Sequence, residues 1–220
     1  MEYMPDGDLG HYIKVRWSES DAKIVAEQVL HALKFMHDNG VVHRDIKPFN
    51  IFPKMDDDCR LTVKVGDFGV ANQGNQNESN LFSTFVGTTE YMAPERFGAS
   101  HTVAVDSWAV GCLLFRMLTG NDIFTCPLAI CQYEFTKQPC LEEELGFCHL
   151  ETRNFIDGLI QPDVKLRAKP RDALGHPWLR ELHGNSEEFG RRLATQTLKN
   201  HFDSVKSAGF KPRSHIMSNT

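Results

Sequence analysis

Apolar residues recur at three- and four-residue steps through residues 18–40, so this segment has one apolar stripe and one polar face. This spacing is typical of an amphipathic α-helix that buries one side. Ser18 and Asp21 offer a capping box at its start, and Gly40 supplies a stop at its end. The pattern predicts a helix over residues 18–40, whose buried stripe consists of Val25, Val29, Leu33 and Met36.

Four further stretches predict helices of different kinds. Residues 103–118 are apolar on all sides, which predicts a helix in the core. Residues 147–160 repeat the amphipathic pattern, and residues 169–179 predict one short helix that stops near Gly175 and Pro177. Residues 186–202 predict one more helix in a C-terminal tail.

Residues 50–69 have a different pattern, in which two short apolar runs flank a polar turn at residues 55–60. This arrangement predicts a β-hairpin. Residues 72–80 are polar and rich in Gly and Asn, which predicts a loop. The expected fold class is therefore mainly α with a small β-hairpin.

Composition narrows the possible functions. The chain has 220 residues, of which 41% are hydrophobic and 24% charged, as in ordinary globular proteins. The formal net charge of -5 gives no electrostatic support for binding nucleic acid or an anionic membrane. No apolar run approaches the ~20 residues that span a bilayer, and the first residues do not resemble a signal peptide. We therefore expect no nucleic-acid or membrane partner.

The six cysteines contain no Cys-x-x-Cys pair. We expect reduced thiols in a cytoplasmic or nuclear protein. The alternative is a zinc site built from the cysteines of residues 126–148 with His149, although their spacing fits no common ligand pattern.

Candidate chemistry lies in the segment "VVHRDIKPFNI", residues 41–51, where charged residues stand between apolar anchors. The predicted hairpin joins Asn50 to Asp67, so these two side chains are expected at one sheet edge. Their oxygen atoms suit Mg²⁺. Asp45 is then placed to accept a hydroxyl proton, and Lys47 to neutralise charge on a transferred phosphoryl group.

Five motifs in order resemble the C-terminal lobe of a eukaryotic-type protein kinase. "HRDIKPFN" resembles the catalytic loop, and "DFG" resembles the magnesium-binding motif. The other three are "GTTEYMAPE", "DSWAVGCLLFRMLTG" and "DVKLRAKPRDALGHPWL". The resemblance covers residues 1–180 and leaves residues 181–220 as a tail. Lys47 and "GTTEY" are similar to the serine/threonine class.

The resemblance implies a role for each matching residue. Asp45, Lys47, Asn50 and Thr88 are implied in catalysis, and Asn50 and Asp67 as Mg²⁺ ligands. It implies contacts to ATP from Met1, Glu2, Met4, Asp8 and Phe52, with Asp67 reaching the nucleotide through the metal. It also implies structural roles for His43, Phe68, Glu95, Asp106 and Arg167, the pair Glu95 and Arg167 being a buried ion pair.

Regulation is implied in the same way. Arg44 resembles the arginine that binds a phosphate on the activation loop. Thr84, or else Ser83, is the expected phosphorylation site, because Thr84 lies three residues before Gly87. Asn72 replaces a basic residue that often assists the arginine.

Two further features separate the chain from the family pattern. Phe49 stands where the family usually has a glutamate that binds a substrate arginine, so an arginine preference loses that support. The 220 residues contain no Gly-x-Gly-x-x-Gly loop and no Val-Ala-Ile-Lys strand, so we expect a protein kinase domain without its N-terminal lobe.

Two functions remain open from the sequence. The first is a serine/threonine protein kinase that uses ATP and Mg²⁺ on a protein substrate, inactive as this fragment alone. The second is a non-catalytic, pseudokinase-like interaction module. The four intact chemical residues favour the first, and the lack of small-lobe motifs favours the second for these 220 residues.

Overall fold

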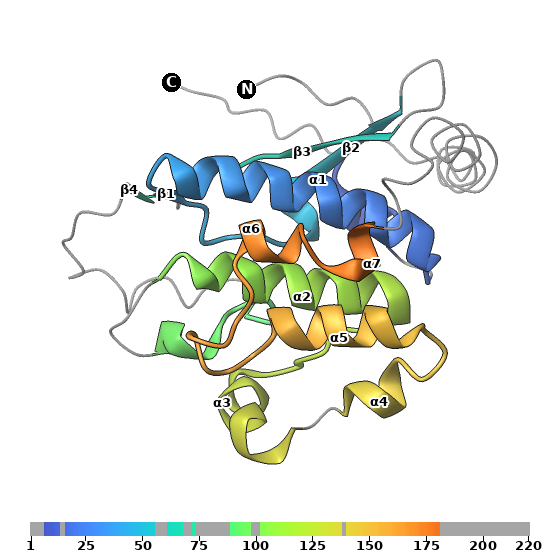
Figure 1. The fold of residues 1–220 in the computed structure, drawn as a ribbon, viewed down its shortest axis with the longest axis vertical. Helices are drawn as coiled ribbons and strands as arrows, with labels where there is room; N and C mark the ends of the chain where they lie inside the picture. Colours follow the sequence, from blue (N-terminus) through green and yellow to red (C-terminus); the bar gives the residue numbers. More distant parts are fainter. Residues whose placement is uncertain are drawn as a thin grey trace, which may run out of the picture.

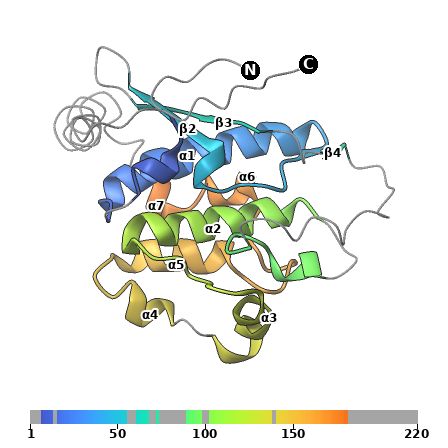
Figure 2. The same ribbon diagram turned by 180° about the vertical axis from the view of Figure 1, so that it is seen from behind.

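The computed structural model describes residues 7–13, 16–55, 61–67, 72–73, 89–97, 102–137 and 140–180. Helices α1 (Glu19–Asp38), α2 (Ala104–Thr119) and α5 (Leu150–Leu159) form successive layers of its core (Figure 1). The β-hairpin lies on the side of α1 away from α2, as the reverse view also shows (Figure 2). The structure thus confirms a mainly helical fold with a small hairpin.

Helix α1 matches its prediction closely. The Ser18 hydroxyl oxygen accepts a hydrogen bond from the Asp21 N–H at 3.2 Å, as an N-cap does. Gly40 follows the last turn with φ +72°, a conformation that glycine adopts without strain. The predicted stripe is buried against α2 and the hairpin, and its members are Val25, Val29, Leu33 and Met36.

Helix α2 is buried on nearly every side, as its apolar composition predicts. Gly111 lies against α5, and a Cβ atom built on it would overlap Ile160 and stand 3.1 Å from the Leu159 Cβ. The lack of a side chain at Gly111 therefore lets α2 and α5 approach closely. Gly120 ends the helix with φ +80°.

The predicted hairpin is formed by β2 (Ile51–Met55) and β3 (Leu61–Val65). Pro53 pairs with Val63, whose N–H donates instead to the Gln28 side chain of α1 at 2.8 Å. This pair is therefore not hydrogen-bonded across the hairpin, so the missing N–H of proline costs no ladder bond. The Gln28 amide also donates to the Leu61 carbonyl at 3.0 Å, which attaches β3 to α1.

The structure corrects several predicted elements. Residues 72–73 are not wholly loop, because β4 (Asn72–Gln73) pairs with β1 (Val41–Val42). The short helix predicted within residues 169–179 is α6 (Pro170–Ala173), and Pro177, near which it was predicted to stop, starts a further helix, α7 (Pro177–Arg180). Two helices were not predicted, α3 (Pro127–Thr136) and α4 (Leu141–Glu144).

Helix α5 begins later than predicted, at Leu150 rather than residue 147. The predicted helix over 186–202 lies outside the described residues. Among the residues that the structure describes, no helix is both long and apolar enough to cross a membrane. The described residues also form three short 3-10 helices: η1 (Leu9–His11), η2 (Pro48–Asn50) and η5 (Pro94–Phe97).

Candidate active site

Asp106, in the first turn of α2, holds the backbone of the segment that joins β1 to η2. Its side chain accepts hydrogen bonds from the His43 N–H at 3.0 Å and from the Arg44 N–H at 2.7 Å. Asp106 is only 1% exposed, so these bonds compensate the burial of its charge. Arg44 has φ +68°, which a non-glycine residue rarely adopts. The Asp106 carboxylate thus fixes a strained turn directly before Asp45.

Two residues that the sequence did not single out support the same turn. His37 of α1 places its Nε2 atom 2.8 Å from the Asp106 carboxylate. Arg96 of η5 donates to the Arg44 carbonyl at 2.6 Å, and burial lowers the pKa of its guanidinium, with the Asp45 charge opposing that shift. Both are ordinary polar residues in their local sequence, so only the tertiary contacts reveal their position.

His43 joins this turn to the end of β3. Its Nδ1 atom accepts a hydrogen bond from the Asp45 N–H at 3.3 Å, so Nε2 carries the proton and donates to the Gly66 carbonyl at 3.0 Å. The Gly66 N–H in turn donates to the Asn50 carbonyl at 2.9 Å. Asp67 follows Gly66 directly, so these bonds bring its backbone to the same end of the hairpin as Asn50.

Asp45 lies at the centre of a compact cluster of polar side chains. Lys47 Nζ donates to Asp45 Oδ2 at 2.7 Å, and the Asn50 side-chain N–H groups donate to Asp45 Oδ2 at 2.8 Å and to its carbonyl at 2.7 Å. The side chains of Asp45 and Lys47 are 25% and 20% exposed. The carboxylate is therefore both oriented by neighbours and open to an incoming group.

The remaining oxygen atoms suit a hard divalent cation. Because the Asn50 amide nitrogen is committed to Asp45, its Oδ1 atom is the one left to act as a ligand. Asp67 is exposed, and its backbone has φ +60°, a conformation that is rare for a residue other than glycine. Carboxylate and amide oxygens are the ligand types that Mg²⁺ prefers, so the residues present fit this ion.

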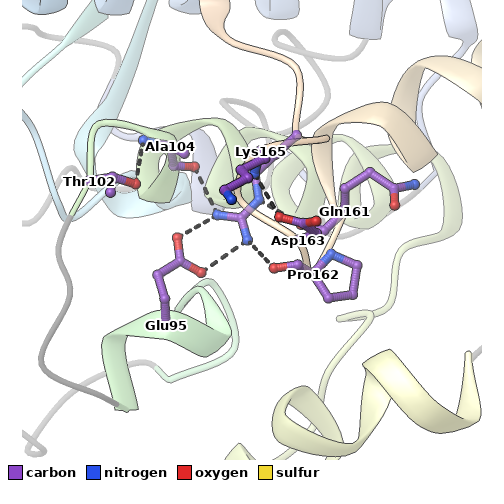
Figure 3. A network of polar contacts seen from close by, with 8 residues as sticks. Glu95, Thr102, Ala104, Gln161, Pro162, Asp163 and Lys165 are labelled. Atoms are coloured by element: carbon purple, nitrogen blue, oxygen red, sulfur yellow. Dashed lines mark hydrogen bonds and ion pairs between the residues drawn. The ribbon is translucent and has the colours of Figure 1, made fainter.

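A second ion pair lies away from the Asp45 cluster, between Glu95 of η5 and Arg167 (Figure 3). The Arg167 guanidinium binds both Glu95 oxygens, at 2.6 and 2.9 Å. It also stands 5.0 Å from the centre of the Trp108 ring. Its remaining donors reach three backbone carbonyls, those of Ala104, Gln161 and Pro162.

Two other predicted site residues, Asp8 and Phe52, belong to the described part of the chain. Asp8 caps η1, since its Oδ1 atom accepts from the Gly10 N–H at 3.0 Å. Phe52 is half-buried in β2, opposite Lys64. Seven predicted residues lie outside the described part of the chain: Met1, Glu2, Met4, Phe68, Ser83, Thr84 and Thr88.

The alternative zinc site gains no support from the described residues. Within them, the structure brings together no group of three or more His, Cys, Asp or Glu side chains that could hold a metal ion. Cys126 and Cys131 are exposed, Cys148 is buried, and all three are free thiols. Burial raises the pKa of Cys148 to about 11, which disfavours the thiolate that zinc requires.

Taken together, the turn held by Asp106, the Asp45 cluster and the end of the hairpin form one polar site on a mainly helical scaffold. The family model described as "Protein kinase domain" matches residues 1–179, and the chain belongs to this family.

Among curated proteins, serine/threonine-protein kinase RAD53 of Saccharomyces cerevisiae is 32% identical over 213 residues, covering 86% of this chain and 25% of that protein. Serine/threonine-protein kinase cds1 of Schizosaccharomyces pombe is 32% identical over 193 residues, covering 81% of this chain and 40% of that protein. The chain thus spans well under half the length of these two relatives.

The chain is also similar to solved protein kinase structures. A crystal structure of the Rad53 kinase domain and SCD2 in complex with AMPPNP superposes with a TM-score of 0.66 at 28% identity. The match covers 94% of this chain and 77% of the Rad53 chain. The likeness therefore extends through the described fold rather than through isolated motifs.

Proposed function

We propose that this chain carries the catalytic residues of a serine/threonine protein kinase, which transfers the γ-phosphoryl group of ATP to a protein hydroxyl. The observation that supports it best is the Asp45 cluster, in which Lys47 and Asn50 orient one carboxylate beside the end of the hairpin. The serine/threonine kinases among its relatives support the substrate class. The AMPPNP in the Rad53 complex supports the nucleotide.

In the proposed mechanism, Mg²⁺–ATP supplies the phosphoryl group. The Asp45 carboxylate orients the substrate hydroxyl and accepts its proton, while its Oδ2 atom is held by Lys47 and Asn50. Lys47, now 2.7 Å from that oxygen, places its positive charge where negative charge develops during transfer. Asn50 and Asp67 are the residues that would hold the metal.

The proposed nucleotide site combines residues from the first eight positions of the chain with one residue of β2. By resemblance, Glu2 and Met4 contact adenine through the backbone, Met1 lines the back of the pocket, and Asp8 reaches the ribose. Half-buried Phe52 supplies apolar contact from β2. Lys47 and Thr88 complete the catalytic set.

Regulation by a phosphate on Thr84, or else on Ser83, is part of the proposal. Arg44 Nε is buried and has no hydrogen-bond partner among the described residues. A phosphate adds nearly two negative charges and suits such a donor. Mass spectrometry of the active protein is expected to find phosphate at position 84, and an unmodified segment around 83 and 84 would contradict this.

The test uses radiolabelled ATP and the longest natural polypeptide that contains this chain. Labelled phosphoserine or phosphothreonine is expected from peptide substrates, with the Asp45→Asn variant as the control. Label on tyrosine alone, or label equal to that of the control, would contradict the proposal.

The second hypothesis, a non-catalytic interaction module, is favoured by one observation: these 220 residues contain no glycine-rich phosphate loop and no small-lobe lysine strand. Phosphoryl transfer depends on positioning and charge stabilisation by such parts. The polypeptide of residues 1–220, assayed alone, is therefore expected to transfer phosphate no faster than its Asp45→Asn variant. Transfer well above that variant would contradict this expectation.

A further inference from the structure

Helix α3 presents apolar side chains to solvent. Leu128 and Phe135 are 63% and 83% exposed, and Cys131, which lies between them along the helix, is an exposed free thiol. An α-helix turns by about 100° per residue, so these three positions fall within about 60° of one another. A free cysteine packs as a small apolar side chain. The three residues therefore form one apolar stripe on the outer surface of the helix, here called the α3 stripe.

The opposite side of α3 attaches the helix to the core. Its buried residues are Ile130 and Tyr133, which lie across the helix from the α3 stripe. The Tyr133 ring makes edge-to-face contacts with Phe124 and Trp108, at centre-to-centre distances of 5.2 and 6.0 Å. One apolar face is enough to hold a short helix on a core, so the fold does not account for the second face. Exposed apolar side chains that gather in this way mark binding surfaces.

The chain around the α3 stripe is acidic. Residues 126–151, from the start of α3 to the first turn of α5, contain five acidic residues and one lysine, which leaves a net charge of -4. The five exposed carboxylates, none of which forms an ion pair with another described residue, are Glu134, Glu142, Glu143, Glu144 and Glu151. The lysine, Lys137, has its Nζ atom 5.3 Å from the centre of the Tyr133 ring. Since the whole chain has a net charge of -5, most of its excess negative charge belongs to these residues.

Helices α3 and α4 share one edge of the molecule. Both views show the two helices at the end that lies away from the β2–β3 hairpin (Figure 1, Figure 2). Leu141, the first residue of α4, follows Lys137 by four residues, so their Cα atoms lie within about 15 Å of each other. A helix of about 18 residues is about 27 Å long, so one bound helix can reach both the α3 stripe and the glutamates of α4.

We propose that the α3 stripe is a docking surface for a basic amphipathic helix of another protein. Side chains three and four residues apart form the ridges by which helices pack together, and the α3 stripe has this spacing. The acidic surroundings favour a partner that carries lysine and arginine beside its apolar face. A second copy of this chain would bring two acidic surfaces together, and nucleic acid or an anionic membrane would be repelled. This inference goes beyond the proposed kinase function and does not depend on it.

The first experiment measures the binding of a probe peptide to the longest natural polypeptide that contains this chain. The probe has about 18 residues, with leucines at three- and four-residue steps and lysines elsewhere, and its fluorescence anisotropy reports binding. One control peptide has the same residues in scrambled order, and another has glutamate in place of lysine. At about 150 mM salt, the probe is expected to bind at least about tenfold more tightly than either control. Equal affinity for the probe and the scrambled peptide would overturn the proposal.

A pair of phenylalanine variants tests the apolar contribution of the α3 stripe. Phe135→Ser removes an exposed ring from the stripe without touching a buried residue, and it is expected to weaken probe binding about tenfold. Phe35→Ser is the matched control, because Phe35 is 71% exposed on α1, and it is expected to leave the affinity unchanged. Equal effects of the two substitutions would contradict a site on α3.

A pair of charge reversals tests the acidic surroundings. Glu134 directly precedes Phe135 on α3, so Glu134→Lys is expected to weaken probe binding about fivefold, and raising the salt concentration is expected to reduce this difference. Asp172→Lys, at an exposed position of α6, makes the same change in net charge and is expected to leave the affinity nearly unchanged. Equal weakening in both variants would mean that net charge alone attracts the peptide, against the proposal.

The thiol of Cys131 provides a direct readout at the α3 stripe. Its alkylation by iodoacetamide, followed by peptide mass spectrometry, is expected to slow about fivefold or more when the probe is saturating, because the bound helix covers the thiol. The scrambled peptide at the same concentration is expected to leave the rate unchanged. Unchanged alkylation with the probe bound would place the peptide elsewhere and overturn the proposal. Self-association that is lost in Phe135→Ser, seen by sedimentation without probe binding, would show that a second copy covers the stripe and would overturn it as well.

Discussion

Two of the carboxylate–cation pairs among the described residues, Asp45–Lys47 and Glu95–Arg167, differ in burial and in their other contacts. In the Asp45–Lys47 pair, the side chains are 25% and 20% exposed. In the Glu95–Arg167 pair, the arginine side chain is fully buried and the glutamate is 12% exposed. Arg167 also has three backbone carbonyls as partners, whereas the side-chain hydrogen bonds of the described residues give Lys47 Asp45 alone.

The difference separates a group that must react from a group that must stay fixed. A partly exposed pair contributes little to stability, because water screens the two charges and because holding the long lysine side chain in one rotamer costs entropy. A buried arginine with every contact satisfied leaves several unpaired groups if it is removed. We therefore expect substitutions in the first pair to change activity and substitutions in the second to change stability.

The largest effect is expected at the Asp45 cluster. Asp45→Asn removes the proton acceptor, so kcat is expected to fall by about 10²- to 10⁴-fold while nucleotide affinity is retained. Asp67→Asn removes a proposed Mg²⁺ ligand, so activity is expected to vanish together with metal-dependent nucleotide binding. Steady-state kinetics and nucleotide titrations of the longest natural polypeptide test both. Equal losses of ATP affinity in the two variants would contradict these separate roles.

The second effect concerns the buried pair. Arg167→Met leaves the Glu95 carboxylate and three carbonyls without their donor, so the free energy of unfolding is expected to fall by about 3–5 kcal/mol. Urea denaturation followed by circular dichroism measures this change.

Lys47→Met is the matched variant for that measurement. It is expected to change the free energy of unfolding by less than about 1 kcal/mol, because its pair is partly exposed. If the two methionine variants lost similar stability, burial would not be what distinguishes the pairs.

How much of the fold the sequence predicted depends on whether an element has a local sequence signal. The helix over residues 18–40 was predicted because its stripe and caps are local signals. Strands β1 and β4 were missed because two-residue strands have no periodicity. Helix α3 was missed because it buries only Ile130 and Tyr133, while Leu128 and Phe135 remain exposed.

The site residues also divide into those that stand in local motifs and those whose partners lie far along the chain. Asp45, Lys47, Asn50 and Asp67 stand in recognisable motifs, and the structure brings the first three together. His37 and Arg96 could not be predicted, because each acts on a partner far along the chain. Asp106 was expected from resemblance, but its contact with His37 becomes visible only when α1 and α2 are packed.

A third, smaller effect tests packing near the buried pair. Gly111→Ala places a methyl group against Ile160, so it is expected to lower the free energy of unfolding by about 1–3 kcal/mol despite the better helix propensity of alanine.

Gly158→Ala in α5 is the matched control for this substitution. Its Cβ would stand 4.0 Å from the Ala168 Cβ, an ordinary contact distance. We expect this variant to be neutral or to raise the free energy of unfolding by up to about 1 kcal/mol. Thermal denaturation of both variants gives the comparison, and equal losses would show that the close contact of Gly111 with Ile160 does not set the loss of stability.

The smallest effect is a pH dependence at His176, a titratable residue that is half-buried. Burial lowers the pKa of His176 below its ordinary value, while Glu151 acts in the opposite direction. Its Nδ1 atom accepts the Trp178 N–H at 3.2 Å at the start of α7, and this bond requires the neutral ring. Its ring also packs 5.1 Å from that of Phe155.

The lowered pKa of His176 determines whether stability rises or falls with pH. Above the ordinary histidine pKa of about 6.5, both folded and unfolded chains hold a neutral His176 and its contribution is complete. As the pH falls through that value, the unfolded chain binds the proton first, so stability is lost. We therefore expect the fall in melting temperature between pH 7.5 and pH 5.5 to be smaller in His176→Gln than in the unaltered chain. The exposed His31 of α1 provides the control, since His31→Gln is expected to leave that fall unchanged. A similar reduction in both variants would mean that burial does not set the acid sensitivity at His176.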